Sequence, residues 1–325
     1  MIKTYRHFGL IVLFNTENGK TAFFHDNVKT IKTKEIPGFH QPINCKTTES
    51  DYKTFYLGFN ISNKCNLNCK YCFRSNKTTF IPTVSYIKEK VTAFLNAHPG
   101  VKKLFLDLSG DGEPLLKLDL IKEIATLCQE LKVVYQIDII PMLISNGVLL
   151  TPQIVKFLQV NLVLFGVSFD GTKAYHDLMR NHTYDIVSQN LLAIKENDYV
   201  GVSMTLSPLF NDDIVSCYLN MLKHAPTVAI RFQRSINQDD YSFHRIATRV
   251  KQGYFELVDL LIAQVKEDNY QLLFSILNGD DYFGKLLIRL LTNTPVDGPC
   301  EGHLARFSYL EDQVYPCAAA SEEGL

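Results

Sequence analysis

The sequence predicts an α/β protein in which six strand–helix units form an incomplete barrel. Between residues 55 and 266, short apolar runs rich in β-branched and aromatic residues alternate with longer amphipathic segments. Successive units of this kind build a parallel sheet with right-handed crossovers. Six units are fewer than the eight that close a TIM barrel. We therefore expect a partial (β/α)6 TIM barrel, open on one side, with an open doubly wound sheet as the alternative.

The expected strands and helices of the core follow one another in regular order. The strands are expected at residues 55–62, 103–108, 136–144, 162–168, 200–206 and 228–233. The helices are expected at residues 84–97, 119–131, 152–159, 184–196, 213–224 and 252–266. Two of these helices have favourable first residues in the pairs Thr151-Pro152 and Asp212-Asp213.

A small β-rich segment is expected before the core. Residues 1–50 are predicted to form this lead-in, with strands at 9–14 and 21–24 and a turn at 15–19. The lead-in either packs against the core as an edge hairpin or offers a strand edge to an extended peptide. The sequence does not separate these two roles.

A short extension is expected after the core. Residues 51–250 are predicted to hold the barrel, and residues 251–325 a helix followed by the extension. Within that region, residues 271–277 are expected to add a strand and residues 281–291 a helix, which Pro295 follows.

The composition is that of a globular chain without a dominant charge. The chain has 325 residues, 46% of them hydrophobic, and its 33 basic residues balance 34 acidic ones. A full core can be buried, and no overall polyanion-binding surface is indicated, so nucleic acid is not an expected partner. No apolar run reaches the roughly 18 residues that a membrane span needs. Because no export signal is found, we expect a cytoplasmic protein with reduced cysteines.

Three cysteines lie together directly after the first expected strand. Cys65, Cys69 and Cys72 have the spacing C-x3-C-x2-C. Thiolates this close repel one another and oxidise easily, so the spacing indicates a metal centre that takes up their charge. A cubane iron–sulfur cluster has four irons and normally four cysteine ligands. Three ligands leave one iron open to a substrate or cofactor.

Two other interpretations of the cysteines are weaker. A tetrahedral zinc site needs a fourth ligand, which Cys45 or His40 would have to supply from upstream. A disulfide framework is disfavoured because the chain is long and not dense in cysteine.

The cysteine loop closely resembles the cluster loop of the radical S-adenosylmethionine (radical SAM) enzymes. In that family an aromatic residue lies between or beside the last two cysteines, and Tyr71 and Phe73 occupy these positions. The resemblance implies a partial (β/α)6 barrel and a [4Fe–4S] cluster whose open iron binds the amine and carboxylate of S-adenosylmethionine. It also implies reductive cleavage to a 5′-deoxyadenosyl radical, which abstracts a substrate hydrogen. An electron donor such as flavodoxin or ferredoxin is then an expected partner.

The resemblance extends to the loop after the second expected strand. Active sites of parallel α/β folds form where strands end and helices begin. Gly110, Asp111, Gly112 and Glu113 lie at such a place. They resemble the family's GGEP-type motif, whose backbone binds the methionyl amine. Asp111 stands where many members have glycine, and we expect its side chain to point away from the ligand.

The ends of the third and fifth expected strands carry further candidate cofactor contacts. Ser145 and Asn146, followed by Gly147, resemble the family's TNG motif. Thr205 ends the fifth strand, where its hydroxyl could reach the ribose of the cofactor.

The fourth strand ends in a motif that resembles one common in peptide-modifying members. The pattern S-x-D-G…H-D…R is formed by residues 168–171, His176, Asp177 and Arg180. The resemblance makes Ser168 and Arg180 partners of the cofactor's carboxylate, and a guanidinium suits that role because it binds carboxylates bidentately. His176 is expected to have a structural role within the loop.

The C-terminal part resembles the start of a SPASM or shorter twitch extension, which carries auxiliary iron–sulfur clusters. Cys300 and a V-Y-P-C sequence ending at Cys317 carry the resemblance, although Gln313 replaces the usual turn glycine. A full SPASM domain has more cysteines, so the sequence is either truncated or has an incomplete auxiliary site. Two structural thiols in a hairpin are the alternative. Cys128 and Cys217 lie in expected helices and are predicted core thiols.

These features predict a radical SAM enzyme that abstracts a hydrogen from a peptide during ribosomal peptide maturation. The substrate class follows from the resemblance, since the S-x-D-G and V-Y-P-C elements occur together in that subgroup. A radical SAM enzyme acting on RNA or a small metabolite is one alternative, and an anaerobic sulfatase-maturase-like enzyme is another. A non-catalytic iron–sulfur scaffold is disfavoured because a scaffold needs no open iron. No residue is assigned as the catalytic group.

Overall fold

The main body of the protein is one mixed sheet with helices along it. The computed structural model describes residues 2–7, 10–15, 21–25, 28, 30–35, 53–72, 80–194, 200–232, 244–278, 283–285, 287, 306–310 and 313–315. Within these ranges the strands of the sheet are β4 (Thr54–Phe59), β5 (Lys103–Asp107), β6 (Asp138–Ser145), β7 (Leu164–Ser168), β8 (Gly201–Leu206), β9 (Thr227–Phe232), β10 (Arg306–Leu310) and β11 (Gln313–Tyr315). Their spatial order is β11-β10-β4-β5-β6-β7-β8-β9.

The helices connect and cover these strands. After β4 the described residues form α1 (Val84–Ala97), η3 (Pro114–Lys117), α2 (Leu118–Tyr135), α3 (Pro152–Val160), α4 (Lys173–Met179), α5 (Tyr184–Ala193), α6 (Ile214–Leu222), α7 (His244–Lys266) and α8 (Gln271–Asn278), and the short helix η1 (Thr33–Glu35) precedes β4. Several begin at a capping side chain, as the sequence predicts for Thr151 and Asp213, which accept hydrogen bonds from N–H groups of the first turn.

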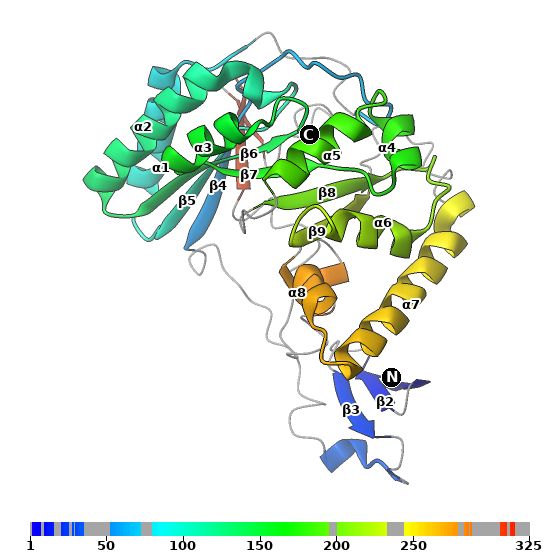
Figure 1. Ribbon diagram of the computed structural model, residues 1–325. Coiled ribbons are helices and arrows are strands. Elements are labelled where there is room, and N and C mark those ends of the chain that lie inside the picture. Colours follow the sequence, from blue (N-terminus) through cyan, green and yellow to red (C-terminus); the bar gives the residue numbers. More distant parts are fainter. Residues whose placement is uncertain are drawn as a thin grey trace.

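The strand order excludes the doubly wound alternative. From β4 to β9 the spatial order is the chain order, and neighbouring strands are parallel. A doubly wound sheet reverses its order at a switch point and carries helices on both faces. Right-handed crossovers without a reversal place all the connecting helices on one face, and α1 to α6 form an arc around the strands (Figure 1). The prediction of a partial barrel with six strand–helix units is confirmed.

A seventh parallel strand joins the sheet from the C-terminal region. β10 pairs in parallel with β4, and β11 turns back antiparallel to β10. The rings of Phe59 on β4 and Tyr309 on β10 stack with their centroids 5.3 Å apart. Gln313, which stands where the resembled motif has its turn glycine, is the first residue of β11. The β10–β11 pair extends the main sheet beside the strand that precedes the cysteine loop.

The core lies between the sheet and its helices. In β4 the side chains of Phe55, Leu57 and Phe59 are buried and alternate with less buried ones. The Phe55 ring packs edge-on against Phe94 of α1, with 5.4 Å between the centroids. The strands therefore present one face to the helices and the other to the interior of the open barrel, where the loops at the strand ends meet.

Two sequence predictions of secondary structure were wrong or incomplete. Residues 271–277 form the helix α8 and not a strand, because Leu272, Ser275 and Ile276 are buried at helical spacing. The helix α4 was not predicted, although Thr172 caps its first turn. Residues 283–285 and 287 are helical as expected, but the remainder of 281–291 lies outside the described residues.

The N-terminal segment forms a sheet of its own. β1 (Ile2–His7), β2 (Leu10–Asn15) and β3 (Thr21–His25) are antiparallel in this order, and Ile11 and Leu13 form its small core. The strands expected at 9–14 and 21–24 are confirmed, whereas β1 was not predicted. Most of the residues between β3 and β4, including His40 and Cys45, lie outside the described residues.

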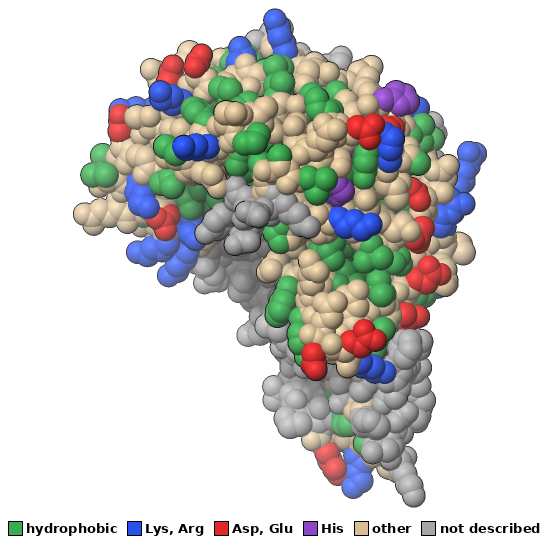
Figure 2. Space-filling model, in the orientation of Figure 1, with side chains coloured by type: hydrophobic (Ala, Val, Ile, Leu, Met, Phe, Trp, Pro, Cys, Tyr) green, Lys and Arg blue, Asp and Glu red, His purple; other side chains and the backbone are tan. Residues whose placement is uncertain are grey.

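The surface has no dominant charge on the face seen in Figure 2. Lys and Arg side chains are interspersed there with Asp and Glu side chains, in keeping with the net charge of −1. In the described part of the chain no helix is long and apolar enough to cross a membrane.

Candidate active site

The cysteine loop follows β4 and is held first by the loop after β5. Gly112 lies against the backbone of this loop, so that a Cβ atom at position 112 would lie 2.3 Å from the Lys64 oxygen and 2.5 Å from the Ser62 oxygen. The Glu113 N–H donates to the same Lys64 oxygen at 2.8 Å. Only glycine allows the two loops to approach this closely. The glycine expected to approach a ligand therefore also fixes the start of the cysteine loop.

Asn60 and Asp111 make a second connection between these loops. The Asn60 amide donates to Asp111 Oδ2 at 2.9 Å, and the Asp111 N–H donates to Asn60 Oδ1 at 3.0 Å. Gly110 packs against the Asn60 side chain. The Asp111 carboxylate, which stands where the resembled motif has glycine, is thus turned toward Asn60.

Glu113 joins the loop after β5 to the loop after β6. Its buried carboxylate accepts hydrogen bonds from the Ser145 hydroxyl and the Asn146 N–H, each at 2.8 Å, and from the Leu115 N–H at 3.1 Å. Burial raises the pKa of Glu113, while the hydrogen bonds from Asn146, Ser145 and Leu115 oppose this rise. The side chains of Glu113 and Ser145 are therefore hydrogen-bonded to each other. The backbone groups of these two residues remain for the predicted contacts with a cofactor.

Asn146 reaches the first cysteine from the end of β6. Its Nδ2 donates to Asn66 Oδ1 at 2.7 Å and lies within hydrogen-bonding distance of Cys65 Sγ at 3.8 Å. Its Oδ1 accepts from the Val148 N–H at 3.1 Å, which fixes the orientation of the amide. A neutral N–H donor is therefore aimed at the sulfur of Cys65.

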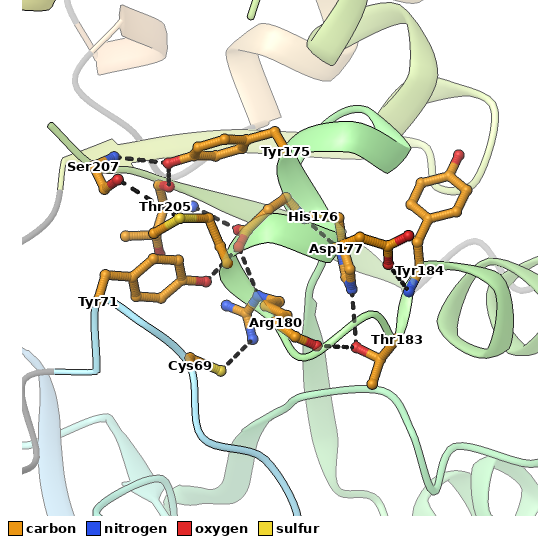
Figure 3. Close-up of polar contacts among 12 residues, drawn as sticks. Cys69, Tyr71, Tyr175, His176, Asp177, Arg180, Thr183, Tyr184, Thr205 and Ser207 are labelled. Atoms are coloured by element: carbon orange, nitrogen blue, oxygen red, sulfur yellow. Dashed lines mark hydrogen bonds and ion pairs between the residues drawn. The ribbon is translucent and has the colours of Figure 1, made fainter. Parts of the chain in front are cut away.

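Arg180 reaches the second cysteine from the end of α4. Its Nε donates to Asp170 Oδ2 at 2.7 Å, and its Nη1 lies 3.9 Å from Cys69 Sγ. Its guanidinium carbon lies 5.2 Å from the centroid of the Tyr71 ring. Figure 3 shows Arg180 between Cys69 and the loop that carries Thr183. A cation is thus held beside the sulfur of Cys69.

Asp170 is the centre of this second group of contacts. Its side chain is fully buried and accepts hydrogen bonds from Arg180 Nε, from the Tyr71 hydroxyl and, at Oδ1, from the Thr205 N–H at 2.9 Å. Asp170 therefore ties the cysteine loop to α4 and to β8. This contact with β8 uses the Thr205 backbone N–H, whereas the contact predicted with the ribose uses the Thr205 hydroxyl.

The charges in this group affect one another. Burial lowers the pKa of Arg180, but Asp170, Tyr71 and Cys69 together raise it above its ordinary value. Burial raises the pKa of the Cys69 thiol, and Arg180 opposes that rise. Burial also raises the pKa of Tyr71 well above its ordinary range. Arg180 therefore stays charged, while Tyr71 stays protonated and donates to Asp170.

His176 supports the loop from inside. Its Nδ1 accepts from the Asp170 N–H at 3.1 Å, and its Nε2 lies 3.2 Å from the Thr183 hydroxyl, which donates to the Arg180 oxygen at 2.7 Å. Burial lowers the pKa of His176 to about 4. The neutral, fully enclosed ring has the structural role expected from the sequence.

The far side of the cysteine loop is bound by the end of α4. The Lys70 N–H donates to the Met179 oxygen at 3.0 Å, and the Asn68 N–H donates to Asn181 Oδ1 at 3.1 Å. Asn181 has a left-handed backbone, with φ of 54°. No sequence pattern predicted a role for Asn181, Asn60 or Asp170, although Asp170 lies within the S-x-D-G motif at residues 168–171.

These contacts place the predicted site residues at one rim. The cysteine loop after β4 contacts the loops after β5 and β6 and the end of α4, and Ser168 and Thr205 lie on the neighbouring strands β7 and β8. Contacts with a cofactor stay predictions for all nine residues, which are Gly110, Asp111, Gly112, Glu113, Ser145, Asn146, Ser168, Arg180 and Thr205. Cys300 and Cys317 lie outside the described residues, and so does any auxiliary site that they would form.

The donor set of the loop fits an iron–sulfur cluster. Among the described residues, no three His, Cys, Asp or Glu side chains converge on one metal ion. In an iron–sulfur cubane each cysteine binds a different iron, so the sulfurs need not converge on one point. Cys65 and Cys69 are half-buried, Cys72 is exposed, and no disulfide links them. Three reduced thiols with N–H donors at two of them fit a cluster with one open iron.

Comparison with known proteins agrees with this interpretation. A family model described as the Radical SAM superfamily matches residues 59–218. The chain is 29% identical over 182 residues to "Radical SAM cyclopropyl synthase TigE" of Paramaledivibacter caminithermalis, a match that covers 48% of this chain and 37% of that protein. It is 27% identical over 188 residues to "GTP 3′,8-cyclase" of Haemophilus influenzae, which covers 55% of this chain and 52% of that protein. The chain thus spans about half or less of these relatives.

Solved structures share the fold. The structure titled "Native anSMEcpe with bound AdoMet and Cp18Cys peptide" matches with a TM-score of 0.64 and 20% identity, covering 82% of this chain and 74% of that one. The structure of Streptococcus suis SuiB bound to precursor peptide SuiA matches with a TM-score of 0.50 and 11% identity, covering 83% and 60%. At these identities the matches establish the fold and not the substrate.

Proposed function

The chain contains a radical SAM domain, and we propose that it is an enzyme that modifies a peptide through a radical reaction. Cys65, Cys69 and Cys72 would hold the [4Fe–4S] cluster that this family uses with S-adenosylmethionine. When bound, these groups supply a 5′-deoxyadenosyl radical that removes a hydrogen atom from the substrate. The proposed substrates include the precursors of ribosomally made peptides, which the enzyme would modify during their maturation. A soluble one-electron donor such as flavodoxin or ferredoxin, and a cytoplasmic setting, belong to the same proposal.

One observation carries the proposal for the cluster. The C-x3-C-x2-C loop is contacted by Gly112 from the loop after β5, by Asn146 from the loop after β6 and by Arg180 from the end of α4. Functional residues are often carried on loops that a rigid scaffold positions. The contacts support the loop that carries the three thiols, and such support around a binding site is what a site-differentiated cluster requires.

The protein's own groups would do the remaining work. The backbone from Gly110 to Glu113 would hold the methionyl amine, and Ser168, Arg180 and Thr205 would line the rest of the cofactor site. Side-chain pairs such as Glu113 with Ser145 keep these backbone segments in position.

The substrate class is supported by likeness to peptide-binding proteins. The titles of two structural neighbours name a bound peptide, Cp18Cys in one and the precursor SuiA in the other. The similarity to GTP 3′,8-cyclase favours a small molecule as the second candidate. Mixed charge on the face seen in Figure 2 gives no basic patch there for RNA.

Anaerobic reconstitution tests the enzyme proposal. The purified chain would be loaded with iron and sulfide, reduced, and incubated with S-adenosylmethionine. We expect a [4Fe–4S] EPR signal and release of 5′-deoxyadenosine. Cys69→Ala should abolish both, whereas Cys128→Ala, which removes a buried core thiol, should retain both. Release of no 5′-deoxyadenosine by the loaded wild-type enzyme would refute the proposal.

A second experiment separates the candidate substrates. Peptides encoded beside this gene, and GTP, would each be incubated with the loaded enzyme and examined by mass spectrometry. A mass change or deuterium transfer into 5′-deoxyadenosine from a labelled peptide supports the peptide proposal. Turnover of GTP with inert peptides would replace it by the small-molecule candidate.

A further inference from the structure

The three cysteines of the loop differ in the groups that surround their sulfur atoms. Arg180 Nη1 lies 3.9 Å from Cys69 Sγ, and Asn146 Nδ2 lies 3.8 Å from Cys65 Sγ. Cys72 is exposed. A charged donor thus faces one sulfur, a neutral donor faces the second, and the third faces solvent. Such an unequal set of contacts affects the properties of any cluster bound there.

Arg180 is held more firmly than a surface cation. Its side chain is 7% exposed, its Nε donates to the fully buried Asp170, and its guanidinium lies over the Tyr71 ring. The backbone of the same residue accepts a hydrogen bond from the Thr183 hydroxyl. A planar guanidinium fixed at one edge by a carboxylate keeps its other N–H groups in a constant direction. In this structure that direction is toward Cys69.

A fixed positive charge beside a ligand sulfur favours the reduced form of a cluster. Reduction adds an electron, and the resulting negative charge is stabilised by a nearby cation and by hydrogen bonds to sulfur. The effect is larger in a buried site, where water screens charges less. The negative charge of Asp170 offsets part of the effect of the Arg180 charge. Asp170, however, lies at the Nε edge of the guanidinium, and its charge is shared with hydrogen bonds from Tyr71 and Thr205.

We propose that Arg180 is a positioning residue that raises the reduction potential of a [4Fe–4S] cluster held by Cys65, Cys69 and Cys72, by donating an N–H group to the Cys69 sulfur. This inference rests on the proposed function, because it requires a cluster at the loop. Arg180 would act on the Cys69 sulfur, a cluster ligand that the protein supplies whether or not S-adenosylmethionine is bound. Asn146 acts in the same direction on Cys65, and its effect is smaller because its donor is neutral.

The test is a redox titration in the absence of S-adenosylmethionine. Wild type, Arg180→Met, Arg180→Lys and Asn146→Ala would be reconstituted anaerobically and titrated while the EPR signal of the reduced cluster is recorded. Arg180→Met should make reduction at least tenfold less favourable, a negative shift of about 59 mV for one electron. Arg180→Lys and Asn146→Ala should give smaller shifts in the same direction. Arg245→Met, which removes an equal charge from an exposed position of α7, should leave the potential unchanged.

The outcomes separate this inference from the proposed function. A wild-type chain that binds no four-iron cluster refutes the proposed function itself. Clusters of equal potential in wild type and both Arg180 variants overturn the role of Arg180 while leaving the enzyme proposal in place. Variants of Arg180 that keep the wild-type circular dichroism spectrum but bind no iron also overturn it, because Arg180 would then be needed for assembly. If Arg180→Met does not fold, the shift of Arg180→Lys decides.

Discussion

Arg180 and Asp170 form an ion pair in which Nε and Oδ2 are 2.7 Å apart and both side chains are buried. The two residues belong to one sequence motif, yet they lie on different elements, the end of α4 and the loop after β7. Their contact joins the loop after β7 to the end of α4. Tyr71 of the cysteine loop donates to the same carboxylate oxygen. The motif therefore stabilises the position of the loop as well as supplying candidate cofactor contacts.

Removing the carboxylate of this pair should be strongly destabilising. Asp170→Ala leaves the Arg180 charge buried without its partner, and we expect the free energy of unfolding to fall by about 3–5 kcal/mol. Urea denaturation of the cluster-free chain measures this change. Asp185→Ala is the matched control, since Asp185 pairs with Lys173 at an exposed site and should have little effect. Similar losses in the two variants would contradict the importance of the buried pair.

The close approach at Gly112 predicts a specific loss of cluster binding. In Gly112→Ala the new Cβ would overlap the Lys64 and Ser62 oxygen atoms, so the cysteine loop must shift. We expect the variant to lose most of its bound iron, and about 1–3 kcal/mol of stability, because overpacking forces the backbone to move. Iron and sulfide analysis after reconstitution measures the first effect. Gly100→Ala meets nothing within 4 Å and should bind a full cluster; equal iron contents would refute the prediction.

The buried His176 predicts how stability depends on pH. Its pKa is lowered by burial to about 4 in the folded chain, against about 6.5 when unfolded. Below pH 6.5 the unfolded chain therefore binds a proton that the folded chain does not, and stability falls as the pH falls toward 4. From these values His176 should contribute a loss of about 2 kcal/mol between pH 7 and pH 5. Urea unfolding at both pH values measures it.

The control for this pH effect is a variant that cannot titrate. In His176→Gln an amide that does not titrate replaces the imidazole ring. The variant should lose less unfolding free energy between pH 7 and pH 5 than wild type, and the difference should equal the contribution of His176. An unchanged pH dependence in the variant would show that other groups cause the loss.

The stack between β4 and β10 predicts that the C-terminal strand stabilises the core. Tyr309→Ala removes the ring that lies against Phe59, and we expect a loss of about 1–3 kcal/mol. Tyr309→Phe keeps the ring and should be close to wild type. Chemical denaturation of the three proteins makes the comparison, and a Tyr309→Ala chain as stable as wild type would exclude a supporting role for β10.

Local patterns predicted the order of the six strand–helix units because each strand and helix has its own hydrophobic period. The helix α8 was mistaken for a strand because the short apolar run Leu272-Leu273-Phe274 fits either period. The parallel pairing of β10 with β4 could not be predicted, since it joins distant segments and depends on which edge of the sheet is open.

The candidate site was predicted in outline. The cysteines and the loops after the strands were recognised from spacing, and the structure brings them to one rim. The partners of individual side chains were not predictable, because a guanidinium such as that of Arg180 can pair with any acceptor that the fold places nearby. The contacts of Asn60 with Asp111 and of Arg180 with Asp170 depend on the positions of separate loops, which a linear pattern does not contain.

The position of β10 also has a consequence for how the protein is made. The strand that precedes the cysteine loop, β4, has β5 on one side and β10 on the other, and all of the helices α1 to α8 are encoded between β4 and β10. During synthesis β4 is therefore an unpaired edge, with its hydrogen-bonding groups exposed, until β10 leaves the ribosome. A chaperone, or early cluster insertion into the loop, would have the whole of that interval in which to act on this edge.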